Sequence, residues 1–459
     1  MHPRRLALGW VMATVLMGYG VLLDRLGGPV TLGPAEVRAY VELDSETFDA
    51  WRSAETQRRS ERVRAMLERV PGAADKVLRA GERGWGLEAA RALRGASGVE
   101  GLPAQLAELR ELAPRGVFAT ATTMKLHAVL GWALPASPEL GPWSLSRALS
   151  DLGSLSVWFL VDRCGFALAW LAGAWLVWGT LGGVMHRLMA LAATRGADGG
   201  LGPACDYVRR RWFDHLFALV VPLAVAGVTA APVLAGGVLF NAPVLDLLGG
   251  VLLLPALLGS VAIVLLMALQ LLGAPLFLPV VAVEGSDGYD AASRGMHYLL
   301  SRPWYAGFLG LVATGLHALG AVLVGGVMLG TLGLVRTLVP WVVRGVAEAD
   351  RFRVLLPADP RDWFPLVDPF TGEGPAGLAW LGALAARLSA AAFVLALPGF
   401  LVAQAAALST WVYLLLRRRG DGTDLGVVFH GEPVAGEARE PDEPASHALN
   451  PANASQEPG

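Results

Sequence analysis

Charge and cysteine are both scarce in this sequence. Only 17% of its 459 residues are charged and 54% are hydrophobic, whereas soluble domains are about a quarter charged. The two cysteines lie in different settings, Cys164 at the start of an apolar run and Cys205 in a basic loop, so no disulfide framework or zinc cluster is indicated. The net charge of -2 lacks the basic excess of nucleic-acid-binding proteins, and we expect no nucleic-acid partner.

Signatures of catalysis are also missing. The sequence contains no Walker loop, no Gly-x-Ser-x-Gly and no His-Glu-x-x-His. The apolar runs contain almost no carboxylates, which argues against an ion-coupled transporter, because such proteins keep carboxylates near the membrane midplane. We therefore predict a protein that is not an enzyme, with no catalytic residues, no cofactor and no metal site.

What the chain does contain is a series of apolar runs of about 20 residues, the length that a helix needs to cross a bilayer. They predict an all-α fold, a polytopic membrane helix bundle of about six helices. The first run follows Arg4 and Arg5 but lacks a small-residue cleavage site, which favours an uncleaved helix over a signal peptide. The predicted spans are residues 6–23, 165–184, 216–239, 247–272, 305–332 and 378–416.

The polar stretches between these runs define the domains. Residues 24–156 balance 17 basic against 17 acidic side chains. Asp44 or Ser45 can cap a helix that Pro71 ends, and Pro103 can begin a second one, residues 104–113. The predicted domains are membrane helix 1 (1–23), a mostly helical extracytoplasmic domain (24–156), a five-helix membrane domain (157–418) and a disordered acidic cytoplasmic tail (419–459).

Two amphipathic segments, residues 117–134 and 143–152, close the polar domain. They either lie along the membrane surface or pack into the core of that domain. From His186 to Trp212 we expect a loop, and after residue 272 an apolar tail that lies at the interface.

Arginine marks the cytoplasmic side, since short cytoplasmic loops carry an excess of basic residues. With both termini cytoplasmic, the cytoplasmic side has 12 arginines and the short external loops have 5. The twelve are Arg4, Arg5, Arg187, Arg195, Arg209, Arg210, Arg211, Arg294, Arg302, Arg417, Arg418 and Arg419.

Two cytoplasmic segments about 90 residues apart are alike, residues 195–212 and 284–304. Each has Gly-x-Asp-Gly, then a tyrosine, then an Arg–Trp pair before an apolar helix. The likeness is either an internal repeat or the common preference of membrane re-entry points for glycine, arginine and tryptophan. The second segment forms a membrane-surface motif of Glu284, Gly285, Asp287, Arg294, Arg302 and Trp304.

This second segment, from Ala282-Val283-Glu284-Gly285 to Arg302-Pro303-Trp304, resembles a motif of uncharacterised bacterial multi-pass membrane proteins. More distantly, residues 160–428 are similar to the membrane domain that accompanies glycerophosphodiester phosphodiesterases. The resemblance implies a bacterial inner (cytoplasmic) membrane location. It transfers no catalytic residue, and the chain lacks the soluble phosphodiesterase domain.

Three polar residues fall inside predicted spans: Gln270, His317 and Gln404. They either line an intramembrane polar pocket or each bond a neighbouring helix.

The function predicted from these features is a non-enzymatic scaffold or accessory component of the cell envelope, with membrane lipids and other membrane proteins as partners. The alternative is a permease-like protein for a lipid or other apolar solute, which would need no midplane charge. A membrane-embedded enzyme is the third interpretation, and it would use polar groups gathered at one membrane face, namely Glu284, Asp287, Asp290, Arg294 and His297.

Overall fold

The structure is a computed structural model that describes residues 2–26, 30–67, 108, 112, 115–133, 145–195, 200–239, 246–342 and 378–429. Helices account for 92% of it, which confirms the all-α class. Along the chain the elements are α1 (Pro3–Leu26), β1 (Val30–Thr31), α2 (Pro34–Glu42), α3 (Ser45–Leu67), β2 (Arg115–Gly116), α7 (Val117–Ala133), α8 (Leu145–Val157), η2 (Trp158–Asp162), α9 (Cys164–Val177), η3 (Trp178–Gly182), α10 (Gly183–Arg195), α11 (Leu201–Arg210), α12 (Trp212–Leu239), α13 (Asp246–Glu284), α14 (Gly288–Ser301), α15 (Pro303–Val342) and α17 (Leu378–Asp421), where η marks a π-helical turn.

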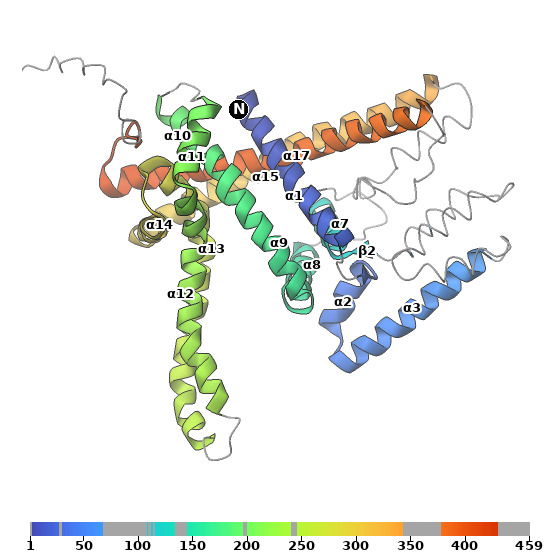
Figure 1. Ribbon diagram of the computed structural model, residues 1–459, viewed down its shortest axis with the longest axis horizontal. Coiled ribbons are helices and arrows are strands. Elements are labelled where there is room, and N and C mark those ends of the chain that lie inside the picture. Colours follow the sequence, from blue (N-terminus) through green and yellow to red (C-terminus); the bar gives the residue numbers. More distant parts are fainter. Residues whose placement is uncertain are drawn as a thin grey trace, which may run out of the picture.

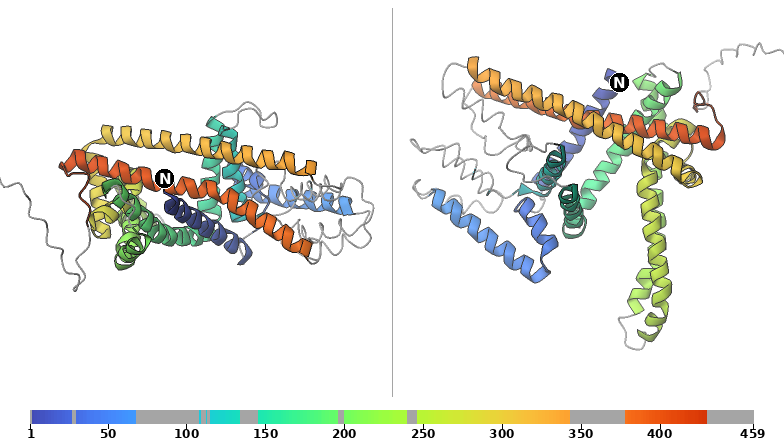
Figure 2. Two further views of the ribbon diagram at one scale, coloured as in Figure 1. Left: turned by 90° about the horizontal axis from the view of Figure 1, so that it is seen from above. Right: turned by 180° about the vertical axis from the view of Figure 1, so that it is seen from behind.

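The long helices are arranged as diverging pairs instead of the single bundle predicted from the sequence (Figures 1 and 2). The α12–α13 pair extends in one direction and the α15–α17 pair in another, while α1 packs against both α17 and α9. The pairs meet where α10, α11 and α14 surround the carboxyl end of α13. We call this meeting point, together with the end of α17 and residues 422–429, the hub.

Four helical segments within the described residues are long and apolar enough to cross a membrane: Pro3–Leu26, Cys164–Ala193, Pro303–Val335 and Ala392–Asp421. A fifth is added if the bent pair Ala256–Gln270 and Leu272–Glu284 counts as one span. The protein is thus a multi-pass membrane protein by the length and composition of its helices.

The bend in α13 explains why the predicted helix 247–272 ends too early. The helix continues to Glu284 after turning by 52° between Gln270 and Leu272. Pro275 lacks the N–H that would bond the carbonyl of residue 271, and its ring clashes with that carbonyl, so the helix bends at this point. The predicted interfacial tail is therefore the last part of a helix.

The loop predicted from His186 to Trp212 is also wrong. The second span runs without a break into α10, and α11 fills most of the rest. His186 and Arg187 are buried inside the helix, at 2% and 5% exposure. Their polar atoms have partners in the fold: the imidazole Nδ1 of His186 lies 3.1 Å from the hydroxyl of Thr410, which is why burial is tolerated.

The two amphipathic segments are the helices α7 and α8. Val117, Phe118 and Met124 of α7 pack around the fully buried Trp158 together with side chains of α1 and α9, so the described part of the first segment is core and not a surface layer. In the second segment, Leu149 of α8 is 59% exposed. Most of residues 68–114, including all of the predicted helix 104–113 except residues 108 and 112, lies outside the described residues. The predicted helix that begins at Ser45 is confirmed as α3 as far as Leu67. Both cysteines are free and exposed.

The crossing of α1 and α17 depends on two glycines in contact. A Cβ built on Gly9 would lie 2.2 Å from the carbonyl oxygen of Gly399, and one on Gly399 would lie 2.6 Å from Cα of Trp10. Such small residues let membrane helices approach closely.

We expect Gly9→Ile to destabilise the α1–α17 contact by about 2 kcal/mol, the usual cost of overpacking. Denaturing-detergent titration of the purified protein would measure it. Gly18→Ile is the matched control, because a Cβ at Gly18 meets nothing within 4 Å. Equal stability of the two variants would contradict the crossing.

Candidate functional site

The hub is built around the carboxyl end of α13. The last four carbonyls of any helix lack partners within the helix. Here Val280, Val281 and Val283 are completely buried, so water cannot donate hydrogen bonds to the carbonyls of this segment. The Val281 carbonyl accepts the Gly285 N–H at 3.0 Å, and distant segments supply the other donors. The Tyr207 hydroxyl donates to the Val281 carbonyl at 2.6 Å, and Arg187 donates to the Ala282 carbonyl at 2.6 Å.

Two further donors complete this cap. The backbone N–H of Phe429 donates to the Val283 carbonyl at 2.8 Å, and the guanidinium of Arg211 donates to the Gly285 carbonyl. A second nitrogen of Arg187 donates to the Phe429 carbonyl at 2.7 Å. Two guanidinium groups at a helix carboxyl end also stabilise the negative end of its dipole.

Gly285 makes the turn out of α13. Its φ of +66° is the left-handed conformation that follows many helices and favours glycine. A Cβ there would also lie 2.4 Å from the ring of Phe429. Asp287 then begins α14, because its carboxylate accepts the N–H of Asp290 at 2.8 Å. Two members of the predicted surface motif thus set the backbone path between α13 and α14.

Glu284, the first member of that motif, is the centre of a charge cluster. Its carboxylate lies 2.6 Å from Arg294 and 3.2 Å from Arg417, and it accepts a hydrogen bond from the Tyr413 hydroxyl. The Glu284 side chain is only 8% exposed. Arg417 also donates to the Val427 carbonyl at 2.8 Å, which links the cluster to residues 422–429.

The first residues of the predicted disordered tail are therefore ordered. Val428 is 7% exposed and belongs to the main apolar core, and Phe429 pairs with α13 as described. The remainder, residues 430–459, lies outside the described residues. Arg302 and Trp304, the last two members of the motif, are exposed where α15 begins, and Trp304 is 90% exposed.

Burial shifts the pKa of two tyrosines in the hub, Tyr207 and Tyr298. Burial raises the pKa of Tyr207, although the nearby Arg187 and Arg211 oppose the change. Burial and a hydrogen bond to Asp421 raise the pKa of Tyr298 as well. Both hydroxyls therefore remain protonated donors at neutral pH.

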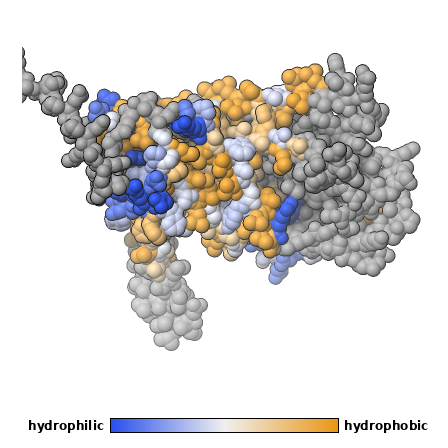
Figure 3. Space-filling model, turned by 45° about the horizontal axis from the view of Figure 1, so that its top comes forward, coloured by the Kyte–Doolittle hydropathy of each residue, from blue (hydrophilic) through white to orange (hydrophobic). Residues whose placement is uncertain are grey.

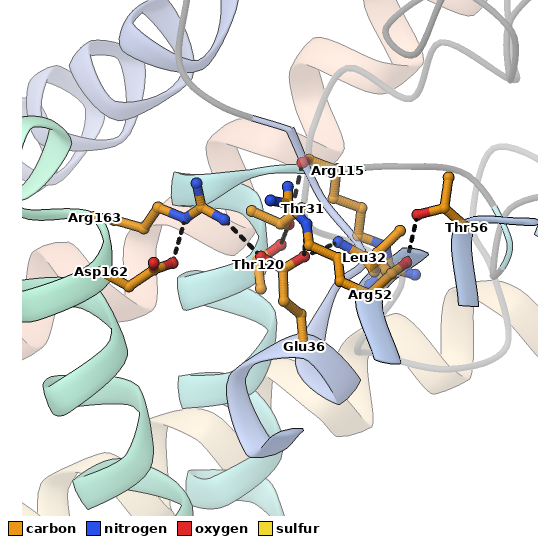
Figure 4. A network of polar contacts seen from close by, with 9 residues as sticks. All are labelled: Thr31, Leu32, Glu36, Arg52, Thr56, Arg115, Thr120, Asp162 and Arg163. Atoms are coloured by element: carbon orange, nitrogen blue, oxygen red, sulfur yellow. Dashed lines mark hydrogen bonds and ion pairs between the residues drawn. The ribbon is translucent and has the colours of Figure 1, made fainter. Parts of the chain in front are cut away.

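A second polar network, which we call the junction, ties the polar region to the spans (Figure 4). Glu36 is completely buried at the start of α2. Its carboxylate lies 2.6 Å from Arg163 at the end of η2 and 3.9 Å from Arg52 of α3, and it accepts the Leu32 N–H at 2.7 Å. Arg163 also pairs with Asp162 at 2.9 Å.

Further contacts hold the junction to α1 and α8. The Asp24 carboxylate accepts the N–H groups of Phe118 at 2.9 Å and Ala119 at 3.0 Å, at the amino end of α7. An anion is stabilised there by the free N–H groups and the helix dipole. Arg38 of α2 pairs with Asp151 of α8 through two hydrogen bonds of 3.1 Å.

The hub and the junction lie at opposite ends of the same helices. Near its start, α1 contacts the hub side through Arg5, whose guanidinium lies 3.8 Å from the sulfur of Met189, and at its end it reaches the junction through Asp24. The second span likewise leads from Arg163 to Arg187. The hub and the junction are therefore separated by the length of one apolar helix, along α1 as well as along the second span.

The three polar residues of the predicted intramembrane pocket divide between helix pairs. The Gln404 amide of α17 donates to the Leu316 carbonyl at 2.9 Å, next to His317 on α15. Among the described residues, no contact joins Gln270 of α13 to either of the others. Two buried atoms, Nδ1 of His317 and Oε1 of Gln404, have no hydrogen-bond partner within the described part of the chain. The pocket stays a prediction.

Arg187, Tyr207 and Phe429 are hub residues whose place in a helix cap the sequence did not predict. Arg187 lies inside the span Cys164–Ala193, and an ionisable residue within a membrane helix is itself a signal of a buried polar role. The sequence holds no such signal for Phe429, because its hydrogen bonds to Val283 and Arg187 are made by backbone atoms, which every residue has.

Chemically, the hub and the junction hold segments together. The structure brings Glu284, Asp290 and Arg294 into contact, since Arg294 lies 2.8 Å from Asp290, but each carboxylate is paired with a cation. Within the described residues, no group of three or more His, Cys, Asp or Glu side chains could hold a metal ion. Comparison with protein families, with curated proteins and with solved structures gives no match for this chain.

Proposed function

We propose that this protein is a non-enzymatic scaffold or accessory component of the bacterial inner membrane, with both termini cytoplasmic and the junction external. The arginine excess around the hub supports this orientation. The resemblance of residues 160–428 to uncharacterised bacterial multi-pass proteins supports the location.

The observation that carries the scaffold proposal is the junction. A completely buried carboxylate between two arginines fixes α2 and α3 to the membrane helices. Beyond this anchor, α3 exposes a face on which Ala54 lies beside the charged side chains of Arg58 and Arg62. A firmly anchored polar helix outside the membrane suits a partner-binding role, because little conformational entropy is lost on binding.

The apolar surface supports membrane or protein partners along the helices. Figure 3 shows a broad apolar surface across the helices, with hydrophilic side chains gathered at the hub end. Leu311 and Val327 of α15 are 73% and 71% exposed. Lipid chains or other membrane helices would cover these side chains.

Photo-crosslinking in the native membrane tests the proposal. A crosslinking amino acid at Ala54 or Arg62 is expected to capture one discrete protein in near-stoichiometric yield. Glu36→Gln removes the charge that anchors α2 and should lower this yield several-fold, since breaking a buried ion pair costs about 3 kcal/mol or more. Glu55→Gln is the control, because Glu55 lies on α3 itself and, among the described residues, pairs with Arg58 and Arg59 of that helix.

Lipid adducts alone from both positions, unchanged by Glu36→Gln, would overturn the scaffold proposal. That outcome would favour the alternative, a permease-like protein for a lipid or other apolar solute. The specific observation behind this alternative is the pair of unpartnered buried atoms on His317 and Gln404, which could bond a solute between α15 and α17.

A further inference from the structure

A cleft of about 670 Å³ opens where α9, α12 and the start of α14 meet. This volume is within the usual range of small-molecule sites. Most of the lining is apolar or aromatic, with two carboxylates where the α13–α14 turn approaches α12. The side chains that line one end are those of Trp175, Leu176, Leu216 and Val220, and those at the other are Trp212, Phe213, Asp214, Phe217, Asp287 and Tyr289.

The walls of this cleft are fixed by specific contacts. The Trp175 indole N–H donates to the Leu216 carbonyl at 3.0 Å, which holds α9 against α12. On the other side, a Cβ at Gly288 would lie 2.7 Å from the Ala218 nitrogen and 2.9 Å from the Asp214 carbonyl oxygen. Only glycine allows α14 to begin so close to the backbone of α12. The cleft is therefore a built feature of the helix packing.

Its mouth leaves large aromatic side chains uncovered. Phe213 is 76% exposed, Phe217 is 55% exposed and Tyr289 is 66% exposed. Trp212, Phe213 and Phe217 lie at the amino end of α12, and Tyr289 lies in the first turn of α14. Aromatic residues of membrane proteins are enriched where helices meet lipid headgroups. The cleft thus offers apolar cover for a chain and aromatic faces for a headgroup.

The charge of the mouth is negative. Burial raises the pKa of Asp214, the nearby Arg211 lowers it, and repulsion from Asp287 raises it again. Arg211 lies 3.6 Å from Asp214 and is committed to the Gly285 carbonyl, and it neutralises one of the two charges. An ammonium group would pair with the remaining negative charge and interact with the aromatic faces.

We propose that this cleft binds the headgroup and upper chain of an ethanolamine phospholipid, with the ammonium group between Asp214 and Asp287. An anionic headgroup is disfavoured by the two carboxylates. The lipid's remaining chain stays in the bilayer beside the exposed rings. The site goes beyond the scaffold proposal and does not depend on it.

The test uses the full-length protein in nanodiscs of equal phosphatidylethanolamine and phosphatidylglycerol with the same chains. After gentle extraction, native mass spectrometry counts the lipids retained. We expect retained ethanolamine lipid to exceed its share in the nanodisc. Asp214→Asn with Asp287→Asn should reduce this preference about tenfold, the effect of losing a charge-assisted hydrogen bond.

The variants are chosen to keep the fold. Asparagine caps helices as well as aspartate does, so Asp287→Asn keeps the start of α14. Asp206→Asn, an exposed carboxylate outside the cleft, is the matched control. Val220→Trp fills the apolar end and should abolish retention without changing charge.

Three results would each overturn the site: equal retention of both lipids, a preference unchanged by the asparagine pair, or retention unchanged by Val220→Trp. The role of the ammonium charge can also be tested with the wild-type protein alone. If it retains N-acetylated phosphatidylethanolamine, which has no ammonium group, as well as the native lipid, the proposal fails.

Discussion

Replacing Arg187 with methionine should destabilise the protein by about 3 kcal/mol, because it leaves buried carbonyl groups without donors. The side chain donates to the Ala282 carbonyl and the Phe429 carbonyl, and its guanidinium lies 4.0 Å from the centre of the Tyr207 ring. Methionine keeps an apolar stem of similar length, so the loss reports the charged group and not the packing.

The free energy of unfolding, measured by denaturing-detergent titration, checks this expectation. Arg210→Met is the control, because Arg210 is exposed on α11, and such surface changes cost about 0.5 kcal/mol or less. If the two variants were equally stable, the helix cap of α13 would not be a main source of the hub's stability.

Glu284→Leu is the second large expected effect. The substitution leaves Arg417, which is 12% exposed, and the Tyr413 hydroxyl without their shared carboxylate. Removing one partner of a buried ion pair costs about 3–5 kcal/mol, since an uncompensated charge stays buried. We expect a loss in this range by the same titration.

A combined variant separates this cause from simple loss of packing. Replacing Glu284, Arg294 and Arg417 together with leucine removes the charges as well as the carboxylate, and buried ion networks are often replaced by apolar residues at little cost. The triple variant should therefore be more stable than Glu284→Leu alone. A triple variant that is less stable than the single one would contradict this explanation.

Much of the architecture follows from local patterns in the sequence. The multi-pass class follows from apolar run length, because a helix needs about 20 apolar residues to satisfy its backbone within a bilayer. The beginning of α3 at Ser45 is a local signal of the same kind. The bend in α13 at residue 271 also has a local cause, Pro275, but run length alone predicts an interfacial tail after it instead of a continued helix.

The membrane-surface motif was predicted in place but not in role. Glu284, Gly285 and Asp287 shape the turn between α13 and α14, whereas Arg302 and Trp304 remain at the exposed start of α15. Spacing in the sequence predicts proximity only between residues of one helix or turn. The motif was therefore defined by the order of its residues along the chain, and not by the contacts that they make in the fold.

The sequence by itself determined that the chain is helical and crosses a membrane more than once, since these properties depend on composition and on contacts within a few residues. Only the tertiary structure decided which helices pair and how polar groups are satisfied. The carbonyls at the end of α13 are bonded by Tyr207, 74 residues away, and by Arg187, 95 residues away. Glu36 meets Arg163 across 127 residues. A buried polar group must find a partner wherever the fold brings one, and no local pattern records which distant segment supplies it.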